Sequence, residues 1–182
     1  METRERGLTL IELMMVVGIL AIIASIAIPN LLLARLNSNQ QYAVQTLQAL
    51  ASAQEKDSNG KERSEPVTVQ QLREDGQIGA VEVNEAVPNR FARRGYHFWL
   101  HTKENGWVCY AWPISFGNSG RQAYVIDQSG VVLVSNNEDT RYNGDEKIPK
   151  IDAAFFDDDG GLSVDDEKPR RDGSPWMLLN QK

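Results

Sequence analysis

One uncharged apolar run near the N-terminus constrains this chain more than any other feature. From Leu13 to Ala34 there is no charged residue, and Glu12 stands directly before the run. A helix that rises about 1.5 Å per residue crosses the roughly 30 Å of a bilayer's hydrocarbon core within a run of this length. A charged side chain costs roughly 2.5–3.5 kcal/mol at the centre of a membrane helix. We therefore predict a membrane helix over residues 8–30 that carries one functional acid.

The residues around the start of this run form a specific signal. Arg6-Gly7 is followed by Leu-Thr-Leu-Ile-Glu-Leu-Met, and Pro29 stands near the end of the run. This pattern resembles the N-terminal signal of type IV pilins and of the related pseudopilins of type II secretion systems. The family usually has Phe where this chain has Leu8.

The resemblance implies how the N-terminus is processed and used. A prepilin peptidase would remove the leader, residues 1–7, by cutting after Gly7, and would methylate the new amino group of Leu8. Glu12 would be the family's assembly glutamate and Pro29 its helix-kinking proline. Pro29 also removes a backbone donor, so it is expected to bend or locally break the helix.

Two simpler interpretations compete for this segment. An ordinary signal peptide, cut near Ser25-Ile26-Ala27, would have a shorter apolar region of about 7–15 residues. A plain single-pass anchor would leave Glu12 without a role. Under either membrane interpretation, Arg4, Arg6 and the amino terminus outweigh Arg35 on the far side, which favours a cytoplasmic N-terminus.

Glu12 is expected to act during filament assembly. In an assembling filament its carboxylate can meet the N-terminal amine of a neighbouring subunit, and the pairing of opposite charges in a low dielectric offsets part of their desolvation. Such a pair would set the axial register between helices that otherwise offer only apolar contact. The alternative is a protonated Glu12 without a function.

Beyond the membrane segment the pattern predicts an amphipathic continuation of the helix over residues 31–58. Apolar side chains recur at helical spacing and form one stripe, and Asn59-Gly60 is a strong stop signal. The members of the stripe are Leu32, Leu36, Ala43, Leu47 and Leu50.

The remaining residues, 61–182, are enough for one small head domain. A capping-box pattern at Thr68 and Gln71 predicts a short helix that closes at Gly76. Four strands are predicted, joined by short links that imply an antiparallel meander packed on the long helix, an α+β fold. They are Tyr96–Leu100, Trp107–Trp112, Arg121–Asp127 and Val131–Ser135. The Gly-Trp strand and the Tyr-Val-Ile-Asp-Gln-Ser-Gly hairpin also resemble pilin heads.

From residue 136 onward the chain is acidic, with 12 Asp and Glu against 7 Lys and Arg. Residues 149–156 are expected to form a short helix, and Trp176 and Leu178 to tie the end back to the sheet. Asp157, Asp159 and Asp165 offer oxygen ligands of the kind that Ca²⁺ prefers, although their spacing is not that of an EF-hand. The alternative is a solvated acidic surface, and no other cofactor is expected.

The head shows no catalytic constellation. Cys109 is the only cysteine, so no internal disulfide is possible, and its place in an alternating strand predicts a small buried side chain on the face of Trp107. His97 and His101 would share a strand face about 13 Å apart, too far to ligate one metal ion. The chain is acidic, with pI about 5.0, so nucleic acid is not expected as a partner despite the arginines near residue 90.

These features predict a structural protein rather than an enzyme. The expected role is a pilin or pseudopilin subunit of a type IV pilus-like or type II secretion filament. Its partners would be other copies or related subunits, the prepilin peptidase, an assembly platform in the bacterial inner membrane, and membrane lipid. The alternative is a membrane-anchored periplasmic binding or sensory domain that does not polymerise.

Overall fold

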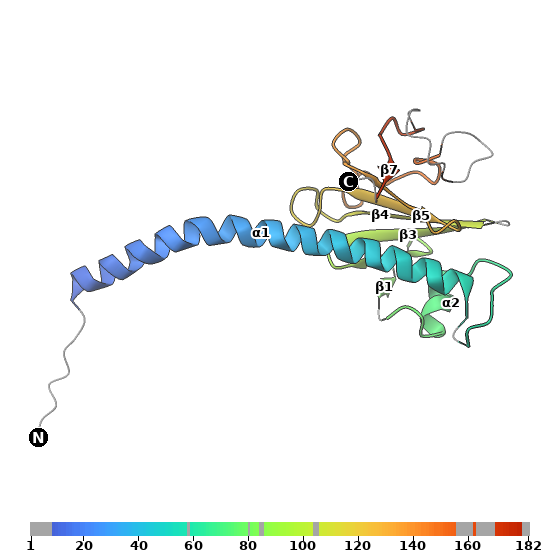
Figure 1. The fold of residues 1–182 in the computed structure, drawn as a ribbon, viewed down its shortest axis with the longest axis horizontal. Coiled ribbons are helices and arrows are strands. Elements are labelled where there is room, and N and C mark those ends of the chain that lie inside the picture. Colours follow the sequence, from blue (N-terminus) through green and yellow to red (C-terminus); the bar gives the residue numbers. More distant parts are fainter. Residues whose placement is uncertain are drawn as a thin grey trace, which may run out of the picture. The chain divides into compact units, whose positions relative to one another are not determined.

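The computed structural model describes residues 9–57, 59–79, 81–83, 86–103, 106–155, 162 and 170–179. Residues 1–35 and 36–182 are two separate units. The helix α1 (Leu10–Glu55) supplies the described structure of the first unit and continues into the second (Figure 1). The second unit therefore contains the end of α1 together with the head.

The second helix, α2 (Val69–Glu74), forms as its sequence predicts. Thr68 is its N-cap, and the capping box is complete, because the Thr68 side chain accepts a hydrogen bond from the Gln71 backbone and the Gln71 side chain accepts one from the Thr68 backbone. Gly76 follows with φ of 70°, a conformation that glycine adopts without steric cost.

The head contains one antiparallel sheet, as predicted, but its described residues form seven strands rather than four. They are β1 (Glu82–Val83), β2 (Arg90–Arg93), β3 (Tyr96–Lys103), β4 (Gly106–Pro113), β5 (Ala123–Asp127), β6 (Val132–Ser135) and β7 (Met177–Leu178). The spatial order is the chain order, and each strand pairs antiparallel with the next. The four predicted strands are β3 to β6, and β1, β2 and β7 are additional.

The three additional strands lacked a readable pattern. β1 and β7 have two residues each, too few for an alternation to show. β2 joins β3 through a tight turn at Arg94-Gly95, where both residues have positive φ, 44° and 80°. A turn of this kind normally carries Asn or Asp before the Gly, so Arg94 conceals the hairpin signal.

One face of the sheet packs on the second half of α1 (Figure 1). Leu47 and Leu50 of the helix are fully buried there among aromatic side chains such as Phe98. Cys109 and Trp107 lie in the same cluster, which confirms that they share a face and that Cys109 is buried. Ala43, Leu47 and Leu50 of the predicted stripe thus belong to this core, whereas Leu32 is 55% exposed.

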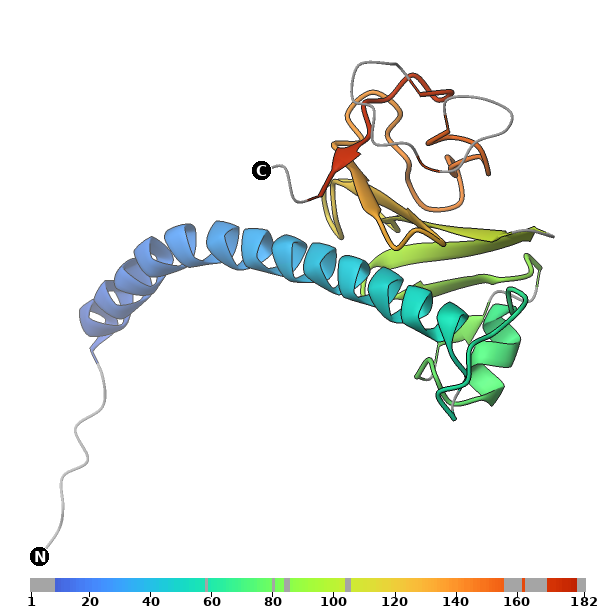
Figure 2. The same cartoon turned by 45° about the vertical axis from the view of Figure 1, so that its right-hand side comes forward.

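The other face of β4 to β6 is covered by the C-terminal region (Figure 2). Tyr110, Trp112 and Leu133 pack there against Ala154 and Trp176, so these central strands are buried on both faces. The burial of Trp176 and the pairing of β7 with β6 confirm that the end of the chain returns to the sheet.

The predicted short helix over 149–156 is wrong in its described part, because residues 151–154 form turns. Two backbone hydrogen bonds, each spanning three residues, define these turns. The Ala153 N–H donates to the Lys150 carbonyl (3.1 Å), and the Phe155 N–H donates to the Asp152 carbonyl (3.0 Å). The Ala154 amide donates instead to the hydroxyl of Tyr110 in the sheet (3.1 Å). A tertiary hydrogen bond therefore replaces the helical one.

Candidate functional site

The start of α1 is a capping box made by Thr9 and Glu12. One oxygen of the Glu12 carboxylate accepts hydrogen bonds from the Thr9 backbone N–H (2.9 Å) and the Thr9 hydroxyl (2.6 Å). The Glu12 N–H donates in return to the Thr9 hydroxyl oxygen (3.3 Å). This reciprocal arrangement satisfies backbone donors that have no partner within the helix.

The capping box gives Glu12 a role within its own subunit. A carboxylate at a helix N-terminus is favoured by the helix dipole, and the box holds it at the backbone N–H of Thr9. Glu12 is therefore positioned before any neighbour arrives. The signal for this arrangement, Thr-x-x-Glu before an apolar run, was present in the sequence, but the interpretation of Glu12 as an assembly residue left it unused.

The side chains of the first unit form an uncovered apolar surface. Every large apolar side chain from Leu10 to Leu33 is at least half exposed. By length and composition α1 is able to cross a membrane, with its most apolar window near the N-terminus. Exposure of an apolar surface of this size to water is unfavourable, so this half of the helix requires lipid or another apolar partner.

Pro29 lies inside α1, and the helix is continuous through it. The proline nevertheless removes one backbone donor, so the carbonyl of Ser25 lacks its usual helical partner. The Ser25 hydroxyl donates to the Ile22 carbonyl (2.7 Å) within the preceding turn. The local break that Pro29 could cause is therefore not found in α1.

Several predicted site residues lie outside the described part of the chain. These are Gly7 and Leu8 at the cleavage site, and Asp157, Asp159 and Asp165 in the candidate Ca²⁺ loop. Among the residues that the structure describes, no group of three or more His, Cys, Asp or Glu side chains is placed to hold a metal ion. The Ca²⁺ hypothesis therefore stays a prediction from sequence.

The two histidines lie on the sheet face opposite α1. The ring of His101 packs against Trp99, with 4.2 Å between ring centroids, and its Nε2 atom is buried without a hydrogen-bond partner. Burial, helped by the nearby Lys103 charge, lowers the pKa of His101 from 6.5 to about 4. Burial also lowers the pKa of His97. Both rings are neutral packing groups at neutral pH.

Lowering the pH from about 6.5 to about 4 is expected to destabilise the head. In this window His101 is protonated in the unfolded chain but not in the folded chain. The free energy of unfolding therefore decreases as the pH is lowered. Urea unfolding of the detergent-solubilised protein at several pH values measures this loss. His101→Gln should flatten the dependence, and an unchanged slope would contradict the assignment. The pKa values of Asp57 and Asp152 are lowered from their ordinary value of 3.8. These two groups therefore change the free energy of unfolding only below about pH 3.8, outside this window.

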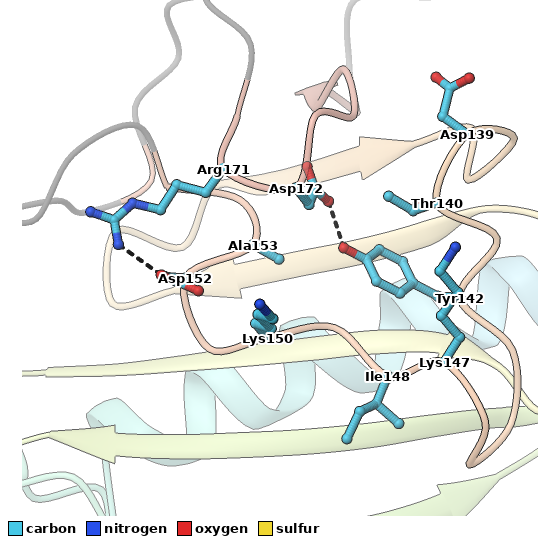
Figure 3. A pocket seen from close by; sticks show the side chains of 10 residues that line it. All are labelled: Asp139, Thr140, Tyr142, Lys147, Ile148, Lys150, Asp152, Ala153, Arg171 and Asp172. Atoms are coloured by element: carbon cyan, nitrogen blue, oxygen red, sulfur yellow. Dashed lines mark hydrogen bonds and ion pairs between the residues drawn. The ribbon is translucent and has the colours of Figure 1, made fainter.

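A cleft of about 740 Å³ opens in the C-terminal region between residues 139–153 and 171–172 (Figure 3). Two of its three acidic side chains, Asp152 and Asp172, are paired from within the protein, whereas Asp139 is exposed. The Tyr142 hydroxyl donates to Asp172 (2.6 Å), and the Arg171 guanidinium donates to Asp152 (2.7 Å). These contacts hold the C-terminal loops together, and we assign no ligand to the cleft.

The geometry of the N-terminal segment matches what comparison with known proteins finds. The family model described as the prokaryotic N-terminal methylation motif matches residues 3–28. The chain carries a prepilin-type N-terminus. The chain is 48% identical over 60 residues to the type IV major pilin protein PilA of Myxococcus xanthus, a match that covers 33% of this chain and 27% of that protein. It is 44% identical over 52 residues to the type II secretion system core protein G of Dickeya chrysanthemi, covering 29% of this chain and 34% of that protein.

These matches define a distant homology to both groups of filament proteins. The chain spans only about a third or less of the length of either relative. No solved structure matches the chain. The family model places the prepilin-type motif at residues 3–28, and the long helix on an antiparallel sheet gives the whole chain a pilin-like architecture.

Proposed function

We propose that this chain is a non-enzymatic structural subunit of a type IV pilus-like or type II secretion filament. The strongest support is that two features occur in the same segment of the chain. The methylation motif covers residues 3–28, and the same stretch of α1 exposes its large apolar side chains. Such a helix requires apolar cover, which lipid provides first and the helices of neighbouring subunits provide after assembly.

In this proposal the chain enters the bacterial inner membrane with its N-terminus in the cytoplasm. A prepilin peptidase cuts after Gly7 and methylates Leu8. An assembly platform then moves the subunit out of the membrane into a filament of identical or related subunits, with the head outside. Glu12, already held at the start of α1 by Thr9, pairs with the N-terminal amine of a neighbouring subunit.

Mass spectrometry of the membrane-extracted protein tests the processing step. After co-expression with a prepilin peptidase, the N-terminal peptide is expected to begin with N-methylated Leu8. Gly7→Val should block cleavage, because in this proposal the peptidase requires a small residue immediately before the cleaved bond. Gly18→Ala is the matched control, since a Cβ at Gly18 meets no atom within 4 Å.

Two other outcomes of this measurement would contradict the proposal. A mature N-terminus near Ile28 would indicate an ordinary signal peptide. An intact Met1 in the presence of an active peptidase would indicate the alternative function, a membrane-anchored binding or sensory domain that does not polymerise.

A further inference from the structure

Two loops of the head meet the helix at Asn39. The Asn39 side-chain amide donates to the backbone carbonyl of Ser119 (2.8 Å). Gly95, in the β2–β3 turn, lies so close that an added Cβ would stand 2.8 Å from Nδ2 of Asn39 and 2.9 Å from Cβ of Ser119. The turn and the loop at 115–120 are therefore both fixed against the first turns of α1 within the second unit.

These loops carry two exposed arginines, Arg94 and Arg121. The guanidinium carbon of Arg94 lies 3.8 Å from the ring centroid of Tyr42, one helical turn beyond Asn39. We call these residues, Arg94 and Arg121 with Asn39 and Tyr42, the basic face. Tyr42 holds the Arg94 guanidinium through a cation–π contact, and a contact with the ring face uses none of the guanidinium's hydrogen-bond donors.

Neither arginine has an acidic partner among the residues that the structure describes. The ion pairs found there use Arg63, Arg90 and Arg171. The carboxylate of Asp145 forms an ion pair with Arg90. Within the described part of the chain the basic face therefore has no paired acid, although the whole chain has a net charge of −6.

Arg94 also adopts an uncommon backbone conformation. Its φ is 44°, in the left-handed region that Gly, Asn and Asp occupy most readily.

Chain connectivity places the basic face close to the membrane surface. The charge-free run ends at Ala34, and Asn39 follows Arg35 after four residues, about 6 Å of helix. The polar headgroup layer on each side of a bilayer is about 5–8 Å deep. When the run spans the hydrocarbon core, the loops at Asn39 therefore lie within reach of the headgroups.

We propose that Arg94 and Arg121 bind the phosphates of anionic phospholipids on the outer surface of the inner membrane while the subunit awaits assembly. A planar guanidinium forms paired hydrogen bonds with phosphate oxygens, and anionic lipid attracts each nearby cation. The head is thereby held against the bilayer by contacts that must break when the subunit is extracted. This inference rests on the proposed membrane-held state.

Arginine-specific labelling tests the lipid contact directly. The full chain is placed in nanodiscs of phosphatidylcholine alone or of phosphatidylcholine with phosphatidylglycerol, and phenylglyoxal modification of each arginine is followed by mass spectrometry. Arg94 and Arg121 are expected to react about fivefold more slowly in the anionic discs. Salt at 1 M should restore the rate of modification, because the screening length of electrostatic interactions is then only about 3 Å. Arg73, exposed on α2 at the far end of the helix, is the internal control.

Three further arms separate the explanations. Adding glycerol phosphate to phosphatidylcholine discs should give no protection, since the proposal requires a membrane surface with net negative charge rather than a free phosphate. Tyr42→Ala should weaken the protection of Arg94 and spare Arg121, whereas Tyr42→Phe should keep both. Equal rates for Arg94 in the two discs, or an equal slowing of Arg73, would overturn the lipid contact alone. Failure of the chain to enter either disc would overturn the membrane-held subunit and this inference with it.

Discussion

Replacing Glu12 by alanine is expected to abolish incorporation of the chain into filaments while its level in the membrane is unchanged. In the proposed filament, the substitution would leave the N-terminal amine of a neighbouring subunit without its partner in a low dielectric. Removal of one member of a buried ion pair typically costs about 3–5 kcal/mol. It also removes the capping box at Thr9, a smaller loss of about 1 kcal/mol. Immunoblots of sheared filaments and of the membrane fraction measure both quantities.

Glu12→Gln separates these two effects. Glutamine keeps a capping box, because its side-chain oxygen can accept from the same backbone N–H, but it carries no charge. If charge pairing drives assembly, Glu12→Gln fails as completely as Glu12→Ala. Thr9→Ala, which breaks the box and keeps the charge, should reduce assembly only modestly. Normal filaments from Glu12→Gln would show that the capping box, rather than the ion pair, is the function of this residue.

Replacing Trp176 by alanine is expected to destabilise the head more than any other change proposed for it. Trp176 is 2% exposed, meets the edge of Tyr110 with 6.1 Å between ring centroids, and donates from Nε1 to Asp172 (3.0 Å). Truncating a buried Trp to Ala typically costs about 3–5 kcal/mol, against a total of about 5–15 kcal/mol for a domain. The single cysteine means that no disulfide can hold the C-terminal region in place instead.

Urea unfolding in detergent, followed by fluorescence of the remaining tryptophans, measures the loss. Trp176→Phe keeps most of the ring contact and loses the bond to Asp172, so its cost should be much smaller. Met177→Ala, at a neighbouring position that is 36% exposed, should change stability by about 0.5 kcal/mol or less. A Trp176→Ala midpoint close to that of Met177→Ala would show that the C-terminal region contributes little to the stability of the sheet.

Local patterns in the sequence were sufficient for the long helix, the short helix and the four central strands. The apolar run, the stripe through Leu47 and Leu50 and the capping box at Thr68 each depend on residues within a few positions of one another. Alternation and short links located β3 to β6 for the same reason. The methylation motif also lies in one contiguous segment, residues 3–28, so the prepilin signal was readable before any fold was known.

Other features depended on contacts between distant residues. β7 exists because residues near 177 reach the edge of β6, and the turns at 151–154 replace a helix because the Tyr110 hydroxyl competes for a backbone amide. The meeting of Arg94 and Tyr42, 52 positions apart in sequence, belongs to the same class.

The sequence by itself thus determined the apolar helix, the position of its one acid and the architecture of helix on sheet. The tertiary structure decided how many strands the sheet has, what covers its second face and which charged side chains are left without partners. The physical reason is the range of the interactions. Periodicity and capping act over one or two turns of chain, whereas strand pairing at an edge and the pairing of charges depend on which distant segments the fold brings together.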